Sequence, residues 1–391
     1  MVATLAHAKP TLADNAMELA SSPVCIRRVE AIPVAIPLRK PVKMAGAMIS
    51  TAENLLVRIE AQDGTVGWGE AASAPTMTGD TLPGLVAAVA DHLTPVLQGQ
   101  DARSRAALLE RMQTALYGNT GAKAAVDMAL IDLIGRSCGV TFSDLIGGAR
   151  RAAVRPMCLI GNETIEQDVA EAGTRRAEGY AFFKLKVGSK ALAEDIAATH
   201  AMRDELGPEI ALCADANQGF TRDGARQYLE GVRDANLLFL EQPISGEDVA
   251  GMAALALTTR TPLCTDEGIH TLADLEAHAR ERAAAGASLK FIKLGGVSAL
   301  MHAASLCESR GLAINVAGKV AESGIASAAV VHAGCAVHDA AWGVSVTDIY
   351  LQADIVREPL RLASDGTIGL PTGPGLGVDV DESAVRLLRV R

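Results

Sequence analysis

Short apolar runs that each end in polar or charged residues recur along the second half of the chain. They read FFKLKVG, IALCADANQG, LLFLEQP, TPLCTDEG, LKFIKLGG and LAINVAGK, with Ala-rich segments of helical periodicity between them. Their spacing is about the length of one strand and one helix, which is the connection that parallel strands require. With a strand in VRPMCLIG and a last one near Ala341 to Ser345, they predict about eight strands in the order of a barrel.

The first third of the chain has different patterns. From residue 25 to about 70, apolar and polar residues alternate with period two, and an Asp-Gly pair at 63–64 predicts a hairpin. From about 81 to 146 the apolar residues recur every three or four positions, and the helix in AAVDMALIDLIGRSCG is expected to end at Gly139. Strands followed by helices predict an α+β domain.

Four segments follow from these patterns, and the fold class is α/β. We expect a poorly ordered extension, an α+β domain, a barrel, and a Gly/Pro-rich C-terminal segment that packs back onto the α+β domain. Their predicted bounds are 1–22, 23–150, 151–355 and 356–391.

Composition narrows the class of ligand and partner. With 391 residues, 49% of them hydrophobic and 21% charged, the chain is an ordinary globular protein. A net charge of −10 and the lack of a Lys/Arg stripe argue against nucleic acid or an anionic membrane as partner, and favour a small molecule. Seven cysteines without a CxxC pair indicate reduced core thiols, and neither a secretory h-region nor an apolar run of membrane length is present, so we expect a soluble cytoplasmic protein.

The polar residues that end the apolar runs carry the chemistry. Lys186, Asp215, Glu241, Asp266 and Lys293 follow one another at intervals of 25 to 29 residues. Each is therefore expected at the C-terminal end of a neighbouring parallel strand, where the active sites of barrel enzymes lie. The pattern predicts one pocket with three carboxylates flanked by two lysines.

Three carboxylates in one pocket indicate a metal site. Asp215, Glu241 and Asp266 would repel one another unless a cation lay between them, and Mg²⁺ or Mn²⁺ is the usual ion for all-oxygen sites. A single acid at a strand end is more often a helix N-cap, but three on consecutive strands favour the metal. Asn217 and Glu267 are expected to orient a ligand or a lysine, or else to cap turns.

The lysines are expected to be acid and base groups. Lys184 and Lys186 are two residues apart, so both side chains project from one face of a strand. Their mutual repulsion, burial and a nearby metal would lower their pKa values and favour the neutral amine that a general base needs. Lys293, followed by Gly295-Gly296, is expected to approach the ligand from the opposite side. The alternative is that these lysines merely lie exposed at strand ends.

Together these motifs resemble those of a known family. The set KxK, DAN, EQP, DE and FIKLGG, preceded by GWGEA and an AxDMALxDLIG-type helix, resembles the muconate lactonizing enzyme subgroup of the enolase superfamily over about residues 25–385. The resemblance implies a capping domain on a (β/α)₇β barrel, Mg²⁺ on Asp215, Glu241 and Asp266, acid/base lysines at 186 and 293, and assembly into homo-oligomers. The mandelate racemase subgroup is disfavoured, because AINVAGK stands where its catalytic histidine is expected.

The implied activity is abstraction of the proton α to a carboxylate, which becomes feasible when a cation and oriented donors stabilise the enediolate. For a small acid, with an amino-acid derivative as the expected substrate, this leads to racemisation, epimerisation or dehydration. A muconate-type cycloisomerase is the alternative within the same fold. A metal-binding barrel without turnover is the alternative outside enzymes.

Specificity is expected from the cap and from the end of the barrel. Loops around Met44–Ser50 and Ala72–Thr81 would close over the barrel mouth, with Met44, Met48, Thr76 and Met77 as candidate substrate contacts. The segment WGVSVTDIY has neither the paired acids of dipeptide epimerases nor the Glu-Leu-Phe of muconate cycloisomerases. Further residues expected to line or neighbour this region are Lys319, Glu322 and Trp342. A Trp near an acid would favour a cationic ligand, although core packing is its commoner role.

Overall fold

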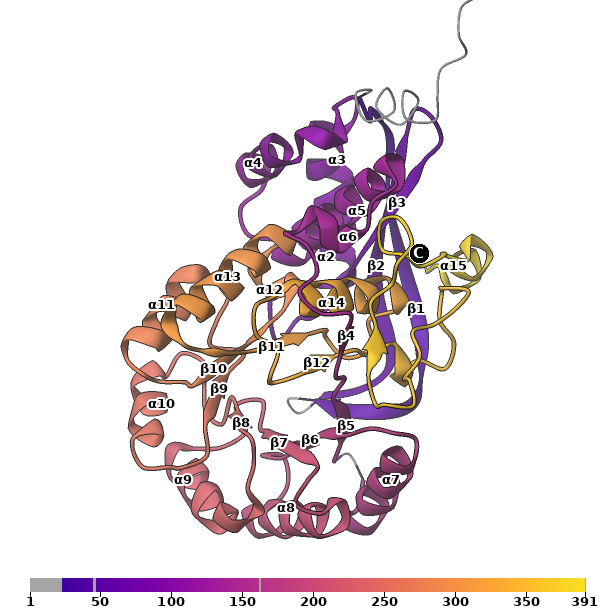
Figure 1. Ribbon diagram of the computed structural model, residues 1–391. Coiled ribbons are helices and arrows are strands. Elements are labelled where there is room, and N and C mark those ends of the chain that lie inside the picture. Colours follow the sequence, from indigo (N-terminus) through magenta and orange to yellow (C-terminus); the bar gives the residue numbers. More distant parts are fainter. Residues whose placement is uncertain (1–22, 45–46, 162, 391) are drawn as a thin grey trace, which may run out of the picture.

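The computed structural model describes residues 23–44, 47–161 and 163–390, without the side chains of residues 43, 44 and 47. The extension predicted over 1–22 and the side chain of Met44 lie outside the described residues. The described ranges form a three-stranded antiparallel sheet with helices, followed by an eight-stranded parallel sheet with helices around it (Figure 1). None of the helices in these ranges combines the length and apolar character that a membrane crossing requires.

The first unit is an antiparallel meander covered by helices, as the alternating pattern predicts. Its strands are β1 (Ile26–Met44), β2 (Ala47–Ala61) and β3 (Val66–Ala72), paired in chain order. The β2–β3 hairpin turns at Gly64, whose φ of 89° is a conformation that glycine adopts without steric cost. The helices are α2 (Leu82–Ala87), the π-helix η1 (Ala88–Leu93), α3 (Thr94–Leu97), the 3₁₀ turn η2 (Ala102–Ser104), α4 (Arg105–Ala115), α5 (Thr120–Cys138) and α6 (Phe142–Leu145).

Helix α5 lies directly on strand β3 because that strand presents glycines to it. A Cβ at Gly69 would be 2.0 Å from the carbonyl oxygen of Ala125, and one at Gly67 would be 2.3 Å from that of Ala129. Glycine is therefore required at both positions in GWGEA for the helix backbone to approach the sheet. The helix is buried along most of its length and ends at Gly139, which adopts a left-handed conformation as predicted.

The second unit is the predicted barrel. Its strands are β5 (Cys158–Ile160), β6 (Phe182–Lys186), β7 (Ala211–Asp215), β8 (Leu240–Glu241), β9 (Leu263–Thr265), β10 (Gly286–Leu289), β11 (Ala313–Ala317) and β12 (Val344–Ser345). Each is parallel to its neighbour, in chain order. The helices are α7 (Ile165–Ala177), α8 (Leu192–Leu206), α9 (Arg222–Gly231), the 3₁₀ turn η3 (Arg233–Ala235), α10 (Val249–Ala256), α11 (Leu272–Arg280), α12 (Phe291–Leu294), α13 (Val297–Arg310) and α14 (Gly324–Ala336).

The barrel closes between its first and last strands at Pro156. A parallel bridge joins Pro156 to Val344, and the amide of Met157 donates to the Val344 carbonyl at 2.8 Å. The predicted first strand, VRPMCLIG, is divided here, because proline has no amide hydrogen to continue a ladder. The residues before it form β4 (Ala153–Val154), which leaves the barrel and pairs with β13 (Ile368–Gly369).

The C-terminal segment returns to the first unit, where Figure 1 shows it in yellow beside the indigo strands. It contains η4 (Asp348–Tyr350), β13 and α15 (Glu382–Leu388). Leu351 bridges to Leu38 of β1, and the amide of Val390 donates to the Pro33 carbonyl at 3.0 Å. These backbone contacts tie the end of the chain to the antiparallel sheet.

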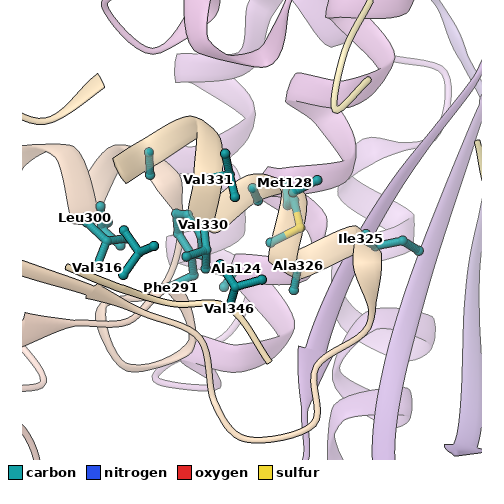
Figure 2. Close-up of a cluster of buried hydrophobic side chains, with 14 of the residues drawn as sticks. Ala124, Met128, Phe291, Leu300, Val316, Ile325, Ala326, Val330, Val331 and Val346 are labelled. Carbon is teal, nitrogen blue, oxygen red and sulfur yellow. The ribbon is translucent and has the colours of Figure 1, made fainter. Parts of the chain in front are cut away.

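Cap helix α5 and the barrel helices share one hydrophobic core. Figure 2 shows Ala124 and Met128 of α5 among side chains from α12, α13, α14 and the last strands. Next to this core, the Asp127 carboxylate accepts the amide of Val297 at 2.7 Å, at the beginning of α13. A Cβ on Gly296 would lie 2.7 Å from the same carboxylate, so the glycine allows this approach. Through these contacts the first unit covers part of the barrel, and below we call it the cap.

Candidate functional site

A cavity lies at the C-terminal ends of the barrel strands, where the sequence predicts the site. It measures about 530 Å³ when its opening to solvent is included, and below we call it the inner cavity. Its charged and amide side chains come from successive strands, with Met77 reaching it from the cap. They are Lys184 and Lys186 of β6, Asp215 of β7, Asn217, Glu241 of β8, Asp266 after β9, Lys290 after β10 and Lys319 after β11.

The three predicted acids line this cavity, and each is paired with a lysine. The Lys186 ammonium donates to Oδ2 of Asp215 at 2.6 Å. Lys184 donates to Oε2 of Glu241, whose Oε1 accepts the Ser288 hydroxyl at 2.9 Å. Every carboxylate is buried, so an unpaired charge would be costly and the lysines supply the counter-charge.

Asp266 is held by two lysines, one on each oxygen. Lys290 donates to Oδ2, and Lys293 donates to Oδ1 at 2.6 Å. Burial opposes ionisation of Asp266, but the two ammonium groups outweigh it and hold the pKa of this carboxyl far below its usual range. Asp266 is therefore a fixed negative charge at the cavity wall.

The barrel order places Lys186 and Lys290 on opposite sides of the cavity. Lys186 ends β6 and Lys290 follows β10, which are four strands apart in a ring of eight. The strands between them, β7, β8 and β9, carry the three carboxylates at or next to their ends. The site is thus an arc of acids with one lysine at each end.

The predicted position of Lys293 is wrong. Strand β10 ends at Leu289, and the chain turns at Lys290 into the helical turn α12, which contains Lys293. Lys293 is fully buried, is absent from the cavity wall, and also donates to the Ser288 carbonyl at 3.1 Å. Lys290 lines the cavity wall at the position predicted for Lys293. Strand periodicity contained this signal, because residues 288 and 290 share one face of an extended segment.

The pKa values of the lysines depend on these ion pairs. Burial opposes the ammonium form of Lys184, but Glu241 and Asp215 outweigh it and raise the pKa well above the usual value. The predicted lowering is therefore wrong for Lys184, because Glu241 supplies its counter-charge. Burial likewise opposes protonation of Lys290, and Asp266 raises its pKa. For Lys293, burial prevails over its ion pair and lowers the pKa.

Asn217 and Glu267 form a chain of contacts that ends on Lys186. The Asn217 side-chain oxygen accepts from Lys186, and its NH₂ group donates to Oε1 of Glu267 at 2.9 Å. Burial, and then the charges of Asp266 and Asp215, raise the pKa of Glu267 to about 7. Its buried Oε2 has no hydrogen-bond partner among the described residues. The pair contacts a lysine, which is one of the two arrangements predicted for it.

The carboxylates provide a donor set for a divalent cation but are not arranged around one. Within the described ranges, no three His, Cys, Asp or Glu side chains lie together as ready ligands of a metal ion. Asp215, Glu241 and Asp266 nevertheless present hard oxygen donors from adjacent strands to one cavity, which suits Mg²⁺. The residues present therefore fit the predicted metal, provided that the carboxylates exchange a lysine contact for it.

A second cavity lies between the cap and the barrel, and below we call it the outer cavity. Met48, 66% exposed, and Thr76 line it from the cap, and Lys319 and Glu267 line it from the barrel. Glu322 lines neither cavity. Its buried carboxylate accepts the backbone amide of Lys319 at 3.1 Å, and burial raises its pKa to about 8. Glu322 thus supports the loop that carries Lys319.

Trp342 is not part of the site. It is buried and stacks on Phe239 with ring centroids 4.3 Å apart, inside a cluster with Phe182 and Met157. A Cβ on Gly286, at the beginning of β10, would lie 2.4 Å from its ring. The side chain therefore fills the end of the barrel where β10 begins, away from the cavity, and the predicted cation contact is wrong.

The chain matches two family descriptions that together span most of its length. Residues 26–147 match the mandelate racemase / muconate lactonizing enzyme N-terminal domain. Residues 167–384 match the description "Enolase C-terminal domain-like".

Two curated relatives have different activities in their names. The L-Ala-D/L-Glu epimerase of Bacillus subtilis (strain 168) is 32% identical over 355 residues, which cover 90% of this chain and 96% of the relative. Muconate cycloisomerase 1-2 of Acinetobacter lwoffii is 31% identical over 376 residues, which cover 94% of this chain and 96% of the relative.

Solved structures share the fold along nearly the whole chain. The muconate lactonizing enzyme of Pseudomonas fluorescens, complexed with muconolactone, has a TM-score of 0.91 at 28% identity and covers 94% of this chain and 100% of its own. The substrate-liganded L-Ala-D/L-Glu epimerase of Bacillus subtilis has a TM-score of 0.85 at 30% identity and covers 90% of this chain and 98% of its own.

Proposed function

The chain belongs to the mandelate racemase and muconate lactonizing enzyme family of the enolase superfamily, and from this premise we propose that it abstracts the proton α to the carboxylate of a small acid. The observation that carries the proposal is the pair Lys186 and Lys290, which face the inner cavity from opposite sides of the barrel. A base on each side of one carbon allows removal of the proton from one face and its return to the other. The expected outcome is racemisation or epimerisation, or dehydration where the substrate carries a β-leaving group.

Lys290 takes the second acid/base role that the sequence assigned to Lys293. It lines the cavity, whereas Lys293 lies in the barrel wall. One lysine, as the neutral amine, accepts the α-proton, and the other, as the ammonium ion, donates a proton to the opposite face. Asn217 and Asp215 hold the Lys186 side chain, and Asp266 holds that of Lys290, so both amines are positioned before the substrate arrives.

We propose Asp215, Glu241 and Asp266 as the ligands of Mg²⁺, with Mn²⁺ as an alternative ion. When bound, the cation supplies positive charge that stabilises the negative charge developing on the substrate carboxylate during proton abstraction. Lys184, which pairs with Glu241 without the ion, lies next to this set of carboxylates.

An exchange experiment in D₂O tests the proposal. The protein with MgCl₂ is incubated with N-acylamino acids, dipeptides and hydroxy acids, and proton NMR follows the α-hydrogen. Racemisation or epimerisation replaces this hydrogen by deuterium and leaves the carbon skeleton intact, whereas dehydration changes the carbon-bound signals. If no acid in the panel exchanges or reacts with metal present, the proposal fails.

The second candidate is a muconate-type cycloisomerase, favoured by the 31% identity to a muconate cycloisomerase. It would use the same two lysines and the same carboxylates on an unsaturated diacid. Incubation with cis,cis-muconate, followed by loss of its ultraviolet absorbance, distinguishes it from the first candidate. Assembly into homo-oligomers stays a prediction, for which light scattering is the measurement.

A further inference from the structure

The inner and outer cavities meet at Lys319. Met77 of the cap, Asn217 and Lys319 line both cavities. A ligand whose reacting carbon lies between Lys186 and Lys290 therefore reaches the outer cavity by passing Lys319. The group that it places there is the part of the substrate remote from the chemistry.

The backbone of Lys319 is fixed on both sides. Its amide donates to Oε2 of Glu322 at 3.1 Å, and its carbonyl accepts the hydroxyl of Thr347 at 2.9 Å. The preceding residue, Gly318, donates its amide to the Ser345 carbonyl at 2.9 Å, on the last barrel strand. The loop that carries Lys319 is thus attached to the barrel, and the side chain begins from a defined point at the cavity wall.

The Lys319 ammonium differs from the other lysines of the inner cavity in having no counter-charge in contact. Lys184, Lys186 and Lys290 each donate to a carboxylate. Within the described ranges, Lys319 makes no ion pair, and its side chain makes no hydrogen bond. Glu322 and Glu53 act on it only as more distant charges, and burial lowers its pKa. A half-buried ammonium without a partner gains from a carboxylate that a ligand brings.

The acids of the outer cavity lie in a different position from Lys319. Glu267 has one oxygen, Oε1, that accepts a hydrogen bond from Asn217 at 2.9 Å, and a second, Oε2, that is buried without a hydrogen-bond partner among the described residues, but it does not line the inner cavity. Glu53 is exposed on the cap, where solvent and salt screen its attraction for a charged ligand. Lys319 is the unpaired charge that lines both cavities, at the point that such a ligand passes.

We propose that Lys319 is a specificity-determining residue that binds a second carboxylate of the substrate, remote from the carbon that loses its proton. The proposal rests on the proposed function and narrows its substrate class to acids with two carboxylates joined by a short chain, such as N-acylamino acids whose acyl group ends in a carboxylate. The α-carboxylate and the reacting carbon occupy the inner cavity, and the acyl carboxylate ends at Lys319.

Binding of matched probes tests this assignment without requiring turnover. The probes are N-malonyl-, N-succinyl- and N-glutaryl-L-alanine, each with the counterpart in which the acyl carboxylate is a carboxamide. A further probe, β-alanyl-L-alanine, ends in an ammonium group. Calorimetry with the full chain and MgCl₂ gives the ratio of carboxylate to carboxamide affinity for wild type, Lys319→Met, Lys319→Gln and Lys319→Arg. Lys40→Met is the control, because it removes the same charge from a separate cavity, where Lys40 pairs with Glu171 at 3.1 Å.

We expect wild type to bind the best carboxylate probe about tenfold or more tightly than its carboxamide, the range expected of a charge-assisted hydrogen bond. Lys319→Met and Lys319→Gln should bring this ratio close to one, while Lys319→Arg and Lys40→Met keep it. If one neutral variant does not fold, as judged by circular dichroism, the other decides. Equal or undetectable binding of carboxylate and carboxamide to wild type overturns the proposal. The proposal is also overturned if the ratio of carboxylate to carboxamide affinity stays the same in Lys319→Met or Lys319→Gln, or if the ammonium probe binds most tightly. A lack of α-proton exchange with intact discrimination counts against the proposed function alone.

Discussion

Lys290 and Lys293 donate to different oxygens of the same carboxylate, that of Asp266, yet only Lys290 reaches the inner cavity. The two lysines are three residues apart, on either side of the point where strand β10 gives way to helix α12. One ammonium therefore faces the ligand and the other lies in the wall behind the carboxylate. Two residues of the same type thus have different predicted roles, one in the chemistry and one in holding Asp266.

Replacing each lysine separately should distinguish these roles. Lys290→Met should lower α-proton exchange by about 10²–10⁴-fold, because it removes an acid/base group. Lys293→Met should keep exchange, because Lys293 does not line the cavity. Each variant breaks a buried ion pair of Asp266 and should lower the free energy of unfolding, by up to roughly 3–5 kcal/mol. Exchange by NMR and urea unfolding measure the two effects. A stable Lys293→Met protein that loses exchange as completely as Lys290→Met would contradict the assignment.

The two cavity lysines should also differ in the enantiomer on which they act. Because Lys186 and Lys290 lie on opposite sides of the barrel, each is expected to remove the α-proton from one face only. Racemisation needs both, so Lys186→Met and Lys290→Met should each abolish it. Each variant should keep slow exchange of one enantiomer, and the enantiomer should be opposite in the two. Proton NMR on separate L and D substrates is the measurement, and loss of exchange from the same enantiomer in both variants speaks against bases on opposite faces.

Removal of the metal should stop turnover and leave the fold intact. The three carboxylates already have lysine partners, so the site keeps its counter-charges without the ion. A chelator should therefore abolish exchange while the far-ultraviolet circular dichroism stays unchanged, and added Mg²⁺ should restore exchange. Glu241→Gln should weaken Mg²⁺ binding in calorimetry, whereas Asp248→Asn, at an exposed pair with Arg222, should not. Full exchange in the chelated protein would rule out the metal.

His332 should make the protein less stable in mild acid. Its Nδ1 accepts the Ser143 amide at 3.2 Å while Nε2 faces the Leu376 carbonyl at 3.1 Å, so the buried ring is bound in the neutral form. Burial lowers its pKa from 6.5 to about 4. Between these values the unfolded chain binds the proton and the folded chain does not, so this contribution is complete above pH 6.5 and is lost as the pH falls toward 4.

The size of this effect is roughly 3 kcal/mol, from about 1.4 kcal/mol for each pH unit. Urea unfolding of wild type and His332→Gln between pH 4 and 7 measures it. The difference in the free energy of unfolding between the two proteins should shrink as the pH falls. Parallel curves for the two proteins would show that His332 does not titrate in this way.

Much of the fold could be predicted from the sequence because it depends on local pattern. The spacing of apolar runs requires parallel strands joined by helices, and the acids that end three consecutive runs are thereby brought to one cavity. Gly139 follows an equally local rule, that of helix termination. The division of VRPMCLIG into two strands could also have been predicted, since Pro156 cannot continue a strand ladder.

Other features depend on contacts that no local pattern contains. FIKL forms a helical turn that ends at Gly295 in a left-handed conformation, and at Gly296 the chain approaches Asp127 of cap helix α5, where a Cβ would lie 2.7 Å from the carboxylate. This turn puts Lys293 in the wall and leaves Lys290 on the cavity. Trp342 fills the far end of the barrel because Gly286 leaves room for it there.

The sequence by itself therefore determined which strand ends carry charge and that those ends meet, because strand and helix periods are local properties of the chain. Only the tertiary structure decided which ammonium groups receive a counter-charge, because the partners of a buried charge are chosen by packing between segments far apart in the chain. Three cavity lysines are matched with carboxylates in this way, and Lys319 is left for the ligand.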